Sequence, residues 1–361
     1  MGHVNRRLSF FASMSWILTV VSMMSSCMKW DYGIEETISI APHGLFVACE
    51  GNFQYGNSSM SFYDPINNRV ENEVFYRANA MKLGDVAQSL SMYENNLWIT
   101  VNNSHVLFAV NANTLKEQGR ITDLPGPRYI QFINSDKAYV TQLWDNRIYI
   151  INPRRYEITG TITVPDMNRE SGSTEQMVKC GRYVYCTCWS YQNRVIKIDT
   201  TTDRIVAQAE VGMQPKSIVL DRNNGLWVMT DGGYQGSVTG HEAPLLCLLD
   251  TADLSIHRRI RFTIDDSPTD LQLNATGDSL YWINTDVWRM SIGASSLPDR
   301  PVIESNGKRL YRLTVSPQDN NIYVADAIDY QQPAIIYRYT RNGELVDKFR
   351  VGITPSSFCW K

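Results

Sequence analysis

A short block of apolar and aromatic residues recurs along the chain, usually followed by a polar or small residue. Such blocks are typical of buried β-strands. Seven copies occur, at residues 45–48, 97–100, 138–141, 184–187, 226–229, 280–283 and 322–325. The third residues of the copies are Val47, Ile99, Val140, Cys186, Val228, Trp282 and Val324, so the spacing ranges from 41 to 54 residues. This spacing is close to the length of one four-stranded propeller blade.

The residues around each block repeat as well. A second apolar run follows and often ends in Asn or Asp, as at 106–111 and 195–199, and a turn leads to a third run such as 205–209. A further strand precedes each block, as at 127–130. Four short strands per unit and no convincing helix predict antiparallel blades. Because seven blades in a ring bury faces that one blade cannot, we predict an all-β fold, a single seven-bladed β-propeller over residues 36–361.

Two segments could supply the strand that closes the ring. Residues 38–42 resemble the inner strand at 313–317, and residues 352–358 resemble the one at 212–218. The sequence does not distinguish between them, and both are expected near the first blade.

The first residues do not belong to the propeller pattern. Arg6 and Arg7 precede an apolar stretch over residues 8–24, and Ser25 and Ser26 lead to Cys27. This order resembles a bacterial lipoprotein signal, and it predicts a signal peptide over 1–26, a lipid on Cys27 and a tether over 27–35. The alternative is an ordinary secretory signal with an incidental cysteine.

The residues after Cys27 bear on its destination. Met28 stands where an inner-membrane retention signal would have Asp, and residues 29–31 weakly resemble the tag of surface lipoproteins. We therefore expect an exported protein anchored by lipid to the outer membrane, at the cell surface. Whether the propeller faces the periplasm or the outside stays open.

Six further cysteines could form disulfides in an exported protein. They are Cys49, Cys180, Cys186, Cys188, Cys247 and Cys359, and their spacing contains no zinc signature. The simplest interpretation is that most are small buried apolar residues. Cys49 and Cys359 belong to neighbouring strands of the first blade if residues 352–358 close the ring, so we expect them to lie within disulfide reach.

Charge and composition narrow the class of partner. The formal net charge is −3 and no run rich in Lys or Arg occurs, which argues against nucleic acid. The 19 Tyr and 9 Trp residues suit strands and also suit a binding face that is both apolar and hydrogen-bonding.

Several segments carry a resemblance to a known family. They are residues 50–53 (EGNF), 84–89 (GDVAQS), 127–130 (PRYI), 227–228 (WV) and 231–233 (DGG). In these the chain resembles the YVTN-type (YncE-like) β-propellers, and more narrowly a family of propeller lipoproteins of uncharacterised function from Gram-negative bacteria. The resemblance implies a cell-surface propeller that accompanies outer-membrane uptake proteins, including those for corrinoids. It supplies no catalytic residues.

Polar residues recur where the inner strands begin, and function must be argued from such a site. The seven residues at this position are Gln88, Arg128, Gln176, Lys216, Thr269, Arg312 and Ser356. They predict a polar ring around the channel mouth, whose three cations could meet a carboxylate or phosphate on a ligand. The alternative is that the cations pair with the neighbouring acids Asp85, Glu175 and Asp270.

The loops after the second strands combine aromatic and polar residues. They contain Phe53, Tyr55, Trp144, Asp145, Trp189, Tyr191, Tyr234, Asp326 and Tyr330. We expect Trp144, Trp189, Tyr191 and Tyr234 to line a cup for a planar or amphipathic ligand, with residues 232–242 as a mobile rim loop. The alternative is that the aromatic residues only pack the blades.

Evidence for catalysis is weaker. The five His residues are scattered, which excludes a His-rich copper centre, and no cofactor is expected. No Gly-x-Ser-x-Gly motif occurs, so a serine nucleophile has no support from the sequence. Glu50, Asn102, Asp231, Asn284 and Asp326 fall near the ends of second strands and could hold Ca²⁺ as in lactonase-type propellers, or they could be ordinary turn residues. Three hypotheses remain: binding of a small molecule for an uptake protein, a Ca-dependent hydrolase, and a scaffold that binds protein.

Overall fold

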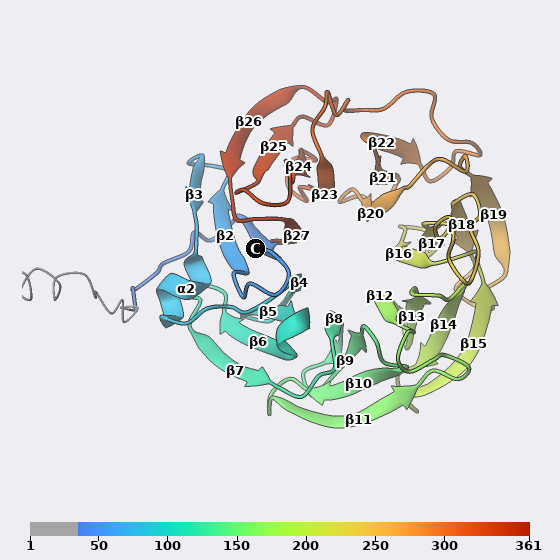
Figure 1. Ribbon diagram of the computed structural model, residues 1–361, viewed down its shortest axis with the longest axis horizontal. Helices are drawn as coiled ribbons and strands as arrows, with labels where there is room; N and C mark the ends of the chain where they lie inside the picture. Colours follow the sequence, from blue (N-terminus) through green and yellow to red (C-terminus); the bar gives the residue numbers. More distant parts are fainter. Residues whose placement is uncertain (1–34) are drawn as a thin grey trace, which may run out of the picture.

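Seven antiparallel sheets surround a central axis in residues 35–361, the part of the chain that the computed structural model describes (Figure 1). From the axis outward, blade 1 contains β27 (Pro355–Trp360), β1 (Leu45–Cys49), β2 (Ser59–Asp64) and β3 (Arg69–Glu71). Blade 2 contains β4 (Ala87–Tyr93), β5 (Asn96–Val101), β6 (Val106–Asn111) and β7 (Glu117–Ile121). Blade 3 contains β8 (Pro127–Asn134), β9 (Lys137–Gln142), β10 (Arg147–Asn152) and β11 (Glu157–Thr163).

The remaining blades follow in the same order around the ring. Blade 4 contains β12 (Thr174–Cys180), β13 (Tyr183–Cys188), β14 (Arg194–Asp199) and β15 (Arg204–Glu210). Blade 5 contains β16 (Pro215–Leu220), β17 (Leu226–Thr230), β18 (Leu245–Leu249) and β19 (Ile256–Arg261). Blade 7 contains β23 (Leu310–Val315), β24 (Ile322–Asp326), β25 (Ile335–Tyr339) and β26 (Leu345–Arg350). The predicted seven-bladed β-propeller is confirmed.

Blade 6 departs from the expected four strands. It contains only β20 (Thr269–Leu273), β21 (Ser279–Asn284) and β22 (Asp286–Ser291). An isolated bridge between Val287 and Ile303 takes the place of the outer strand. Pro298 and Pro301 lie in the segment that returns to this bridge, and a proline has no N–H for a strand ladder.

Two short helices accompany the sheets within residues 35–361. The α-helix α2 (Val74–Asn79) connects blades 1 and 2 and buries Val74, Phe75 and Ala78, and the 3-10 helix η1 (Asn102–Ser104) follows β5. Among residues 35–361 no helix is long and apolar enough to cross a membrane. The predicted signal peptide and Cys27 lie outside the described residues.

The C-terminal strand closes the ring. β27 pairs with β1 in blade 1, with Trp360 opposite Leu45 and Cys359 opposite Phe46. Of the two candidate segments, residues 352–358 therefore supply most of the inner strand. Residues 38–42 form no strand, although Ile38 and Ile40 pack into the core of blades 1 and 2.

The expectation that Cys49 and Cys359 lie within disulfide reach is wrong. Cys359 lies opposite Phe46, three residues before Cys49 on β1, and all six described cysteines are free. Three residues of strand span about 10 Å, beyond the ~7 Å that a disulfide can bridge. An odd offset also turns the two side chains to opposite faces of the sheet, and they pack in different core clusters.

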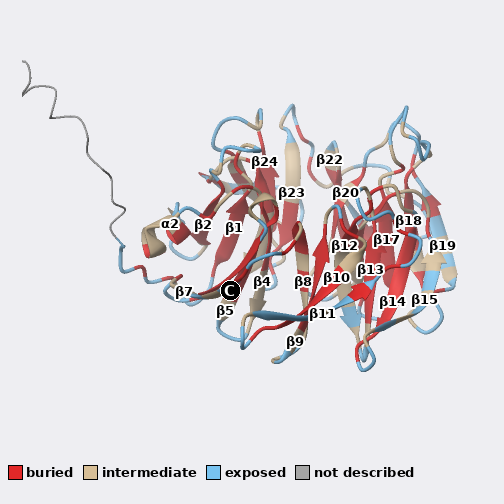
Figure 2. Ribbon diagram, turned by 60° about the horizontal axis from the view of Figure 1, so that its bottom comes forward, coloured by how far each residue is buried: buried red, intermediate tan, exposed pale blue. Residues whose placement is uncertain are grey.

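The core lies between neighbouring blades. The second strands β1 and β17 are buried at every residue, whereas outer strands such as β15 alternate between exposed and half-buried residues (Figure 2). Trp227 of blade 5 and Trp282 of blade 6 belong to one cluster, and both are almost fully buried. This packing holds the inner strands side by side around the axis and so positions their ends.

Candidate functional site

Each inner strand begins with a β-bulge. The pairing of inner and second strand shifts register after the first strand residue in all seven blades, for example between Ala87 and Ser89 and between Pro215 and Ser217. A bulge leaves a residue unpaired and re-aims its side chain. The residues that directly follow the first strand residue are Gln88, Arg128, Glu175, Lys216, Asp270, Tyr311 and Ser356. We call these seven residues the bulge ring.

The bulge ring lies at one end of the propeller, because all inner strands start there and contact one another around the axis. Each member carries a polar or ionisable group. Gln88, Arg128, Lys216 and Ser356 are in the predicted position. The other three predicted members, Gln176, Thr269 and Arg312, lie one residue away from the bulge ring, which contains Glu175, Asp270 and Tyr311 instead.

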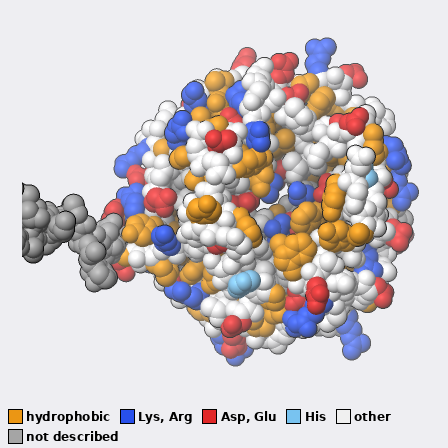
Figure 3. Space-filling model, in the orientation of Figure 1, with side chains coloured by type: hydrophobic (Ala, Val, Ile, Leu, Met, Phe, Trp, Pro, Cys, Tyr) orange, Lys and Arg blue, Asp and Glu red, His pale blue; other side chains and the backbone are white. Residues whose placement is uncertain are grey.

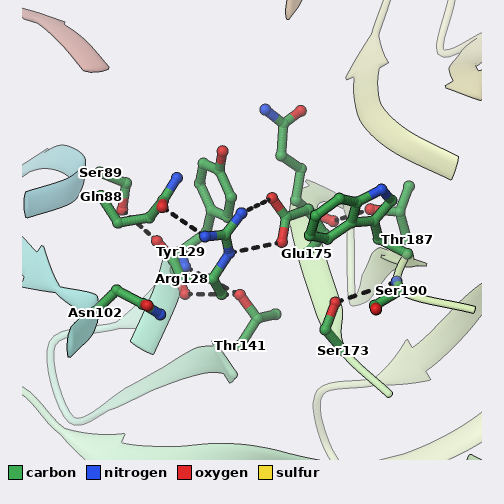
Figure 4. Close-up of polar contacts among 12 residues, drawn as sticks. Gln88, Ser89, Asn102, Arg128, Tyr129, Thr141, Ser173, Glu175, Thr187 and Ser190 are labelled. Carbon is green, nitrogen blue, oxygen red and sulfur yellow. Dashed lines mark hydrogen bonds and ion pairs between the residues drawn. The ribbon is translucent and has the colours of Figure 1, made fainter. Parts of the chain in front are cut away.

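Arg128 is held in a buried ion pair (Figure 4). Its Nε donates to Glu175 Oε2 at 2.8 Å, its Nη2 to Glu175 Oε1 at 2.6 Å, and its Nη1 to Gln88 Oε1 at 2.6 Å. Burial alone would lower the pKa of Arg128, but the Glu175 carboxylate raises it above its ordinary value. For this cation, pairing with a neighbouring acid is the arrangement that the structure contains.

Lys216 and Arg312 differ from Arg128. Neither forms an ion pair with any residue of the described chain, and within that chain the Lys216 ammonium also has no hydrogen bond. Burial and the nearby Arg312 guanidinium lower the pKa of Lys216 below its ordinary value. These two cations are therefore available to an anion that enters the mouth.

Trp189 lies between two cations. Its ring centroid is 5.6 Å from the Arg128 guanidinium carbon and 5.4 Å from Lys216 Nζ, which is within the range of cation–π contact. Its Nε1 donates to Asp231 Oδ2 at 2.9 Å, and Gln214 Nε2 donates to the other oxygen of the same carboxylate. The indole is thus fixed by the loop that follows β17.

Arg312 lines a cavity of about 70 Å³ inside the channel, together with Tyr129, Gln176 and Asp270. Its Nε donates to the Ser356 carbonyl at 2.9 Å, and its guanidinium lies 4.6 Å from the Tyr311 ring centroid. Burial raises the pKa of Asp270, against the effect of Arg312. A cavity of this size has room for one small polar group and not for a whole nutrient.

The predicted aromatic residues lie in loops at the same end, which is hollowed at its centre with Lys and Arg atoms visible inside (Figure 3). Trp144 is 52% exposed and Tyr234 is 53% exposed. The neighbouring Tyr234 hydroxyl raises the pKa of Tyr191, so these two residues lie close together. Trp189 is the member of the predicted set that reaches the cations.

The five residues of the calcium hypothesis all form hydrogen bonds with other residues of the described chain. Asp231 accepts from Trp189 and Gly233, Asn284 bonds with Asp266, and Glu50 accepts from the Tyr311 hydroxyl at 3.1 Å. The other two behave alike: Asn102 donates to the Pro127 carbonyl, and Asp326 accepts from the backbone N–H of Arg309 and Ile328. Within residues 35–361 no three His, Cys, Asp or Glu side chains form a group that could hold a metal ion.

Solved structures with the same fold have varied functions. A quinoprotein alcohol dehydrogenase-like protein from Bacteroides thetaiotaomicron superposes with a TM-score of 0.67 at 14% identity, over 88% of this chain and 78% of that one. A putative 6-phosphogluconolactonase from Bacteroides uniformis superposes with a TM-score of 0.65 at 12% identity, over 88% and 99%. Streptogramin B lyase superposes with a TM-score of 0.56 at 13% identity, over 73% and 82%. At these identities the likeness shows the fold alone.

The curated proteins contain no match to the sequence. A family model does match, over residues 43–353, which is most of the propeller. The chain belongs to the family described as a domain of unknown function, DUF5074.

Proposed function

We propose that the protein binds a small molecule at the channel mouth and performs no catalytic step on it. The observation that carries this proposal is the pair Lys216 and Arg312, two cations without a carboxylate partner among residues 35–361. Removing a cation from water without a counter-charge costs free energy. An anionic group on the ligand offsets this cost through charge-assisted hydrogen bonds.

The surroundings of the two cations favour an amphipathic ligand. Trp189 presents its ring face beside Lys216, and the exposed Trp144 and Tyr234 lie in loops at the same end. Pockets lined by aromatic surface with a few placed polar groups are typical of small-molecule sites. The ligand would lay an apolar or planar body against these rings and direct its anionic group toward Lys216 and Arg312.

The N-terminal sequence supports a location for this activity. Arg6 and Arg7, the apolar stretch over 8–24 and the small residues before Cys27 favour a lipid-anchored protein on the outer membrane. The resemblance to YVTN-type propeller lipoproteins favours the same location. We infer that the protein delivers its ligand to an outer-membrane uptake protein, and an anionic nutrient such as a corrinoid fits this role.

Calorimetric titration of the mature protein with corrinoids and other anionic nutrients tests the proposal. Lys216→Gln and Arg312→Gln should each weaken binding about tenfold or more, since a charge-assisted hydrogen bond contributes about 1.5–3 kcal/mol. Lys179→Gln, at an exposed lysine near the opposite end of β12, serves as the matched control and should bind as the native protein does. Equal affinity in all four proteins would place the site elsewhere.

A further inference from the structure

A second polar cavity lies between blades 6 and 7. Its volume is about 470 Å³, and it is lined by turn residues that include Asn274, Asn320, Arg341 and Asn342. These turns follow β20, β23 and β25, whereas the bulge ring lies where the inner strands begin. The cavity, which we call the blade 6–7 notch, is therefore at the opposite end of the propeller from the channel mouth.

One side chain in the notch lacks a partner that two of its counterparts have. The second strands of blades 3, 4, 6 and 7 carry a tyrosine at the same position of the repeat, namely Tyr139, Tyr185, Tyr281 and Tyr323, and within the described chain the Tyr323 hydroxyl has no hydrogen bond either. The hydroxyls of the first two bond to a turn of the next blade, Tyr139 to Asp203 and Tyr185 to the Thr251 carbonyl. Tyr281 is only 2% exposed, lines the notch, and has no hydrogen bond from its hydroxyl within the described chain.

The turn that should cover Tyr281 is held elsewhere. Blade 6 has no outer strand, and the β25–β26 turn lies against the segment that ends at the Val287–Ile303 bridge. Gly343 of this turn has φ +87°, and a Cβ there would lie 2.0 Å from the Val302 carbonyl oxygen. A residue with a Cβ could not approach Val302 as closely as Gly343 does. The turn therefore lies against Val302, and the Tyr281 hydroxyl faces the notch.

Two arginines give the notch a positive charge. Arg289 is directly opposite Tyr281 in the sheet, and its Nη1 donates to the Arg341 carbonyl at 2.7 Å. Neither Arg289 nor Arg341 forms an ion pair with another residue between 35 and 361. The one carboxylate in the lining, Asp278, is already bonded to Arg222 and to three neighbouring side chains.

We propose that the blade 6–7 notch binds an acidic saccharide unit, meaning a hydroxylated ring that carries a carboxylate or phosphate. The two guanidinium groups match the anionic substituent in geometry and charge. The Tyr281 hydroxyl and the Asn342 side chain match ring hydroxyls, which both donate and accept. The volume lies within the range of small-molecule sites.

Saturation-transfer NMR on the mature protein tests this with glucuronate, glucose 6-phosphate, glucose and inorganic phosphate at millimolar concentration. One or both acidic sugars should bind at least tenfold more tightly than glucose and inorganic phosphate, and their order distinguishes carboxylate from phosphate recognition. Absence of binding by both acidic sugars overturns the proposal. Inorganic phosphate binding as tightly as the sugar phosphate also overturns it, because contacts with the sugar hydroxyls would then add nothing to the affinity.

Substitutions test whether the acidic sugar binds in the blade 6–7 notch. Arg341→Ala should weaken it tenfold or more, and Tyr281→Phe several-fold, since this change removes a hydroxyl that has no partner in the described chain. Arg204→Ala, at an exposed arginine of β15, and Lys216→Gln, at the mouth, should both leave it unchanged. Native affinity in both notch variants, or a loss in the Lys216 variant, overturns the assignment to this cavity.

Discussion

Replacing Glu175 by Gln should lower the free energy of unfolding by about 3–5 kcal/mol, because Arg128 would remain buried without its counter-charge. The carboxylate is 1% exposed and accepts two hydrogen bonds from the guanidinium, at 2.8 and 2.6 Å. Arg128→Met should lower the free energy of unfolding by a similar amount, because it leaves the Glu175 carboxylate buried without a counter-charge.

The double variant Arg128→Met with Glu175→Leu tests whether the loss of stability comes from leaving one buried charge unpaired. Replacing both members of a buried ion pair by apolar groups is often neutral or stabilising, so the double variant should regain most of the loss. The exposed pair of Arg155 and Glu157 is the matched control, at 3.0 Å with side chains 67% and 47% exposed. Glu157→Gln should cost less than about 1 kcal/mol.

Urea unfolding followed by tryptophan fluorescence measures all four variants, and the native urea slope must be preserved for the free energies to be comparable. A loss below about 1 kcal/mol in Glu175→Gln or in Arg128→Met would refute the reasoning, because it would mean that water reaches the buried pair. A double variant no more stable than the single ones would refute it as well.

Three further predictions follow from other parts of the chain. Affinity for an anionic ligand at the mouth should fall as the pH rises from neutral to alkaline, because Lys216 loses its proton. Burial lowers the pKa of Lys216, so the fall should begin at a lower pH than for an ordinary lysine of pKa 10.5. Calorimetry at a series of pH values checks this, and an identical profile in Lys216→Gln contradicts it. Tyr185→Phe should cost about 1 kcal/mol of unfolding free energy and Tyr281→Phe much less, because only Tyr185 has a hydroxyl partner in the described chain; equal losses in denaturant titrations would be inconsistent with this. Cys27→Ser should abolish lipid labelling and membrane association, and an unchanged palmitate label in fractionated cells would disprove the lipid anchor.

The seven blades could be predicted because the second strand of each blade is buried on both faces. Such strands appear as continuous apolar blocks, as in β1 and β17, whose residues are all buried. Outer strands leave no comparable signal, since β15 only alternates between half-buried and exposed positions. For this reason the missing outer strand of blade 6 could not be predicted from the sequence.

The predicted polar ring lies at one end of the propeller, but in three blades its residue is one position away from the bulge. Assigning faces by alternation assumes that each residue advances the strand by one step, and a β-bulge breaks this assumption. Gln176, Thr269 and Arg312 were selected as polar residues near a strand start, whereas the bulge ring contains Glu175 and Asp270. The usable signal was the first strand residue, such as Pro127 or Pro215, directly before the bulge residue.

The charged residues in and beside the bulge ring therefore have two different roles. Around blades 3 to 6 the ring alternates in sign, from Arg128 to Glu175, Lys216 and Asp270. The first two neutralise each other, so removing either one destabilises the fold and says little about binding. Lys216 and Arg312 form no such ion pair within residues 35–361, although Asp270 lines the same cavity as Arg312. Substituting these two cations should change ligand affinity more than stability, which makes them the informative positions for function.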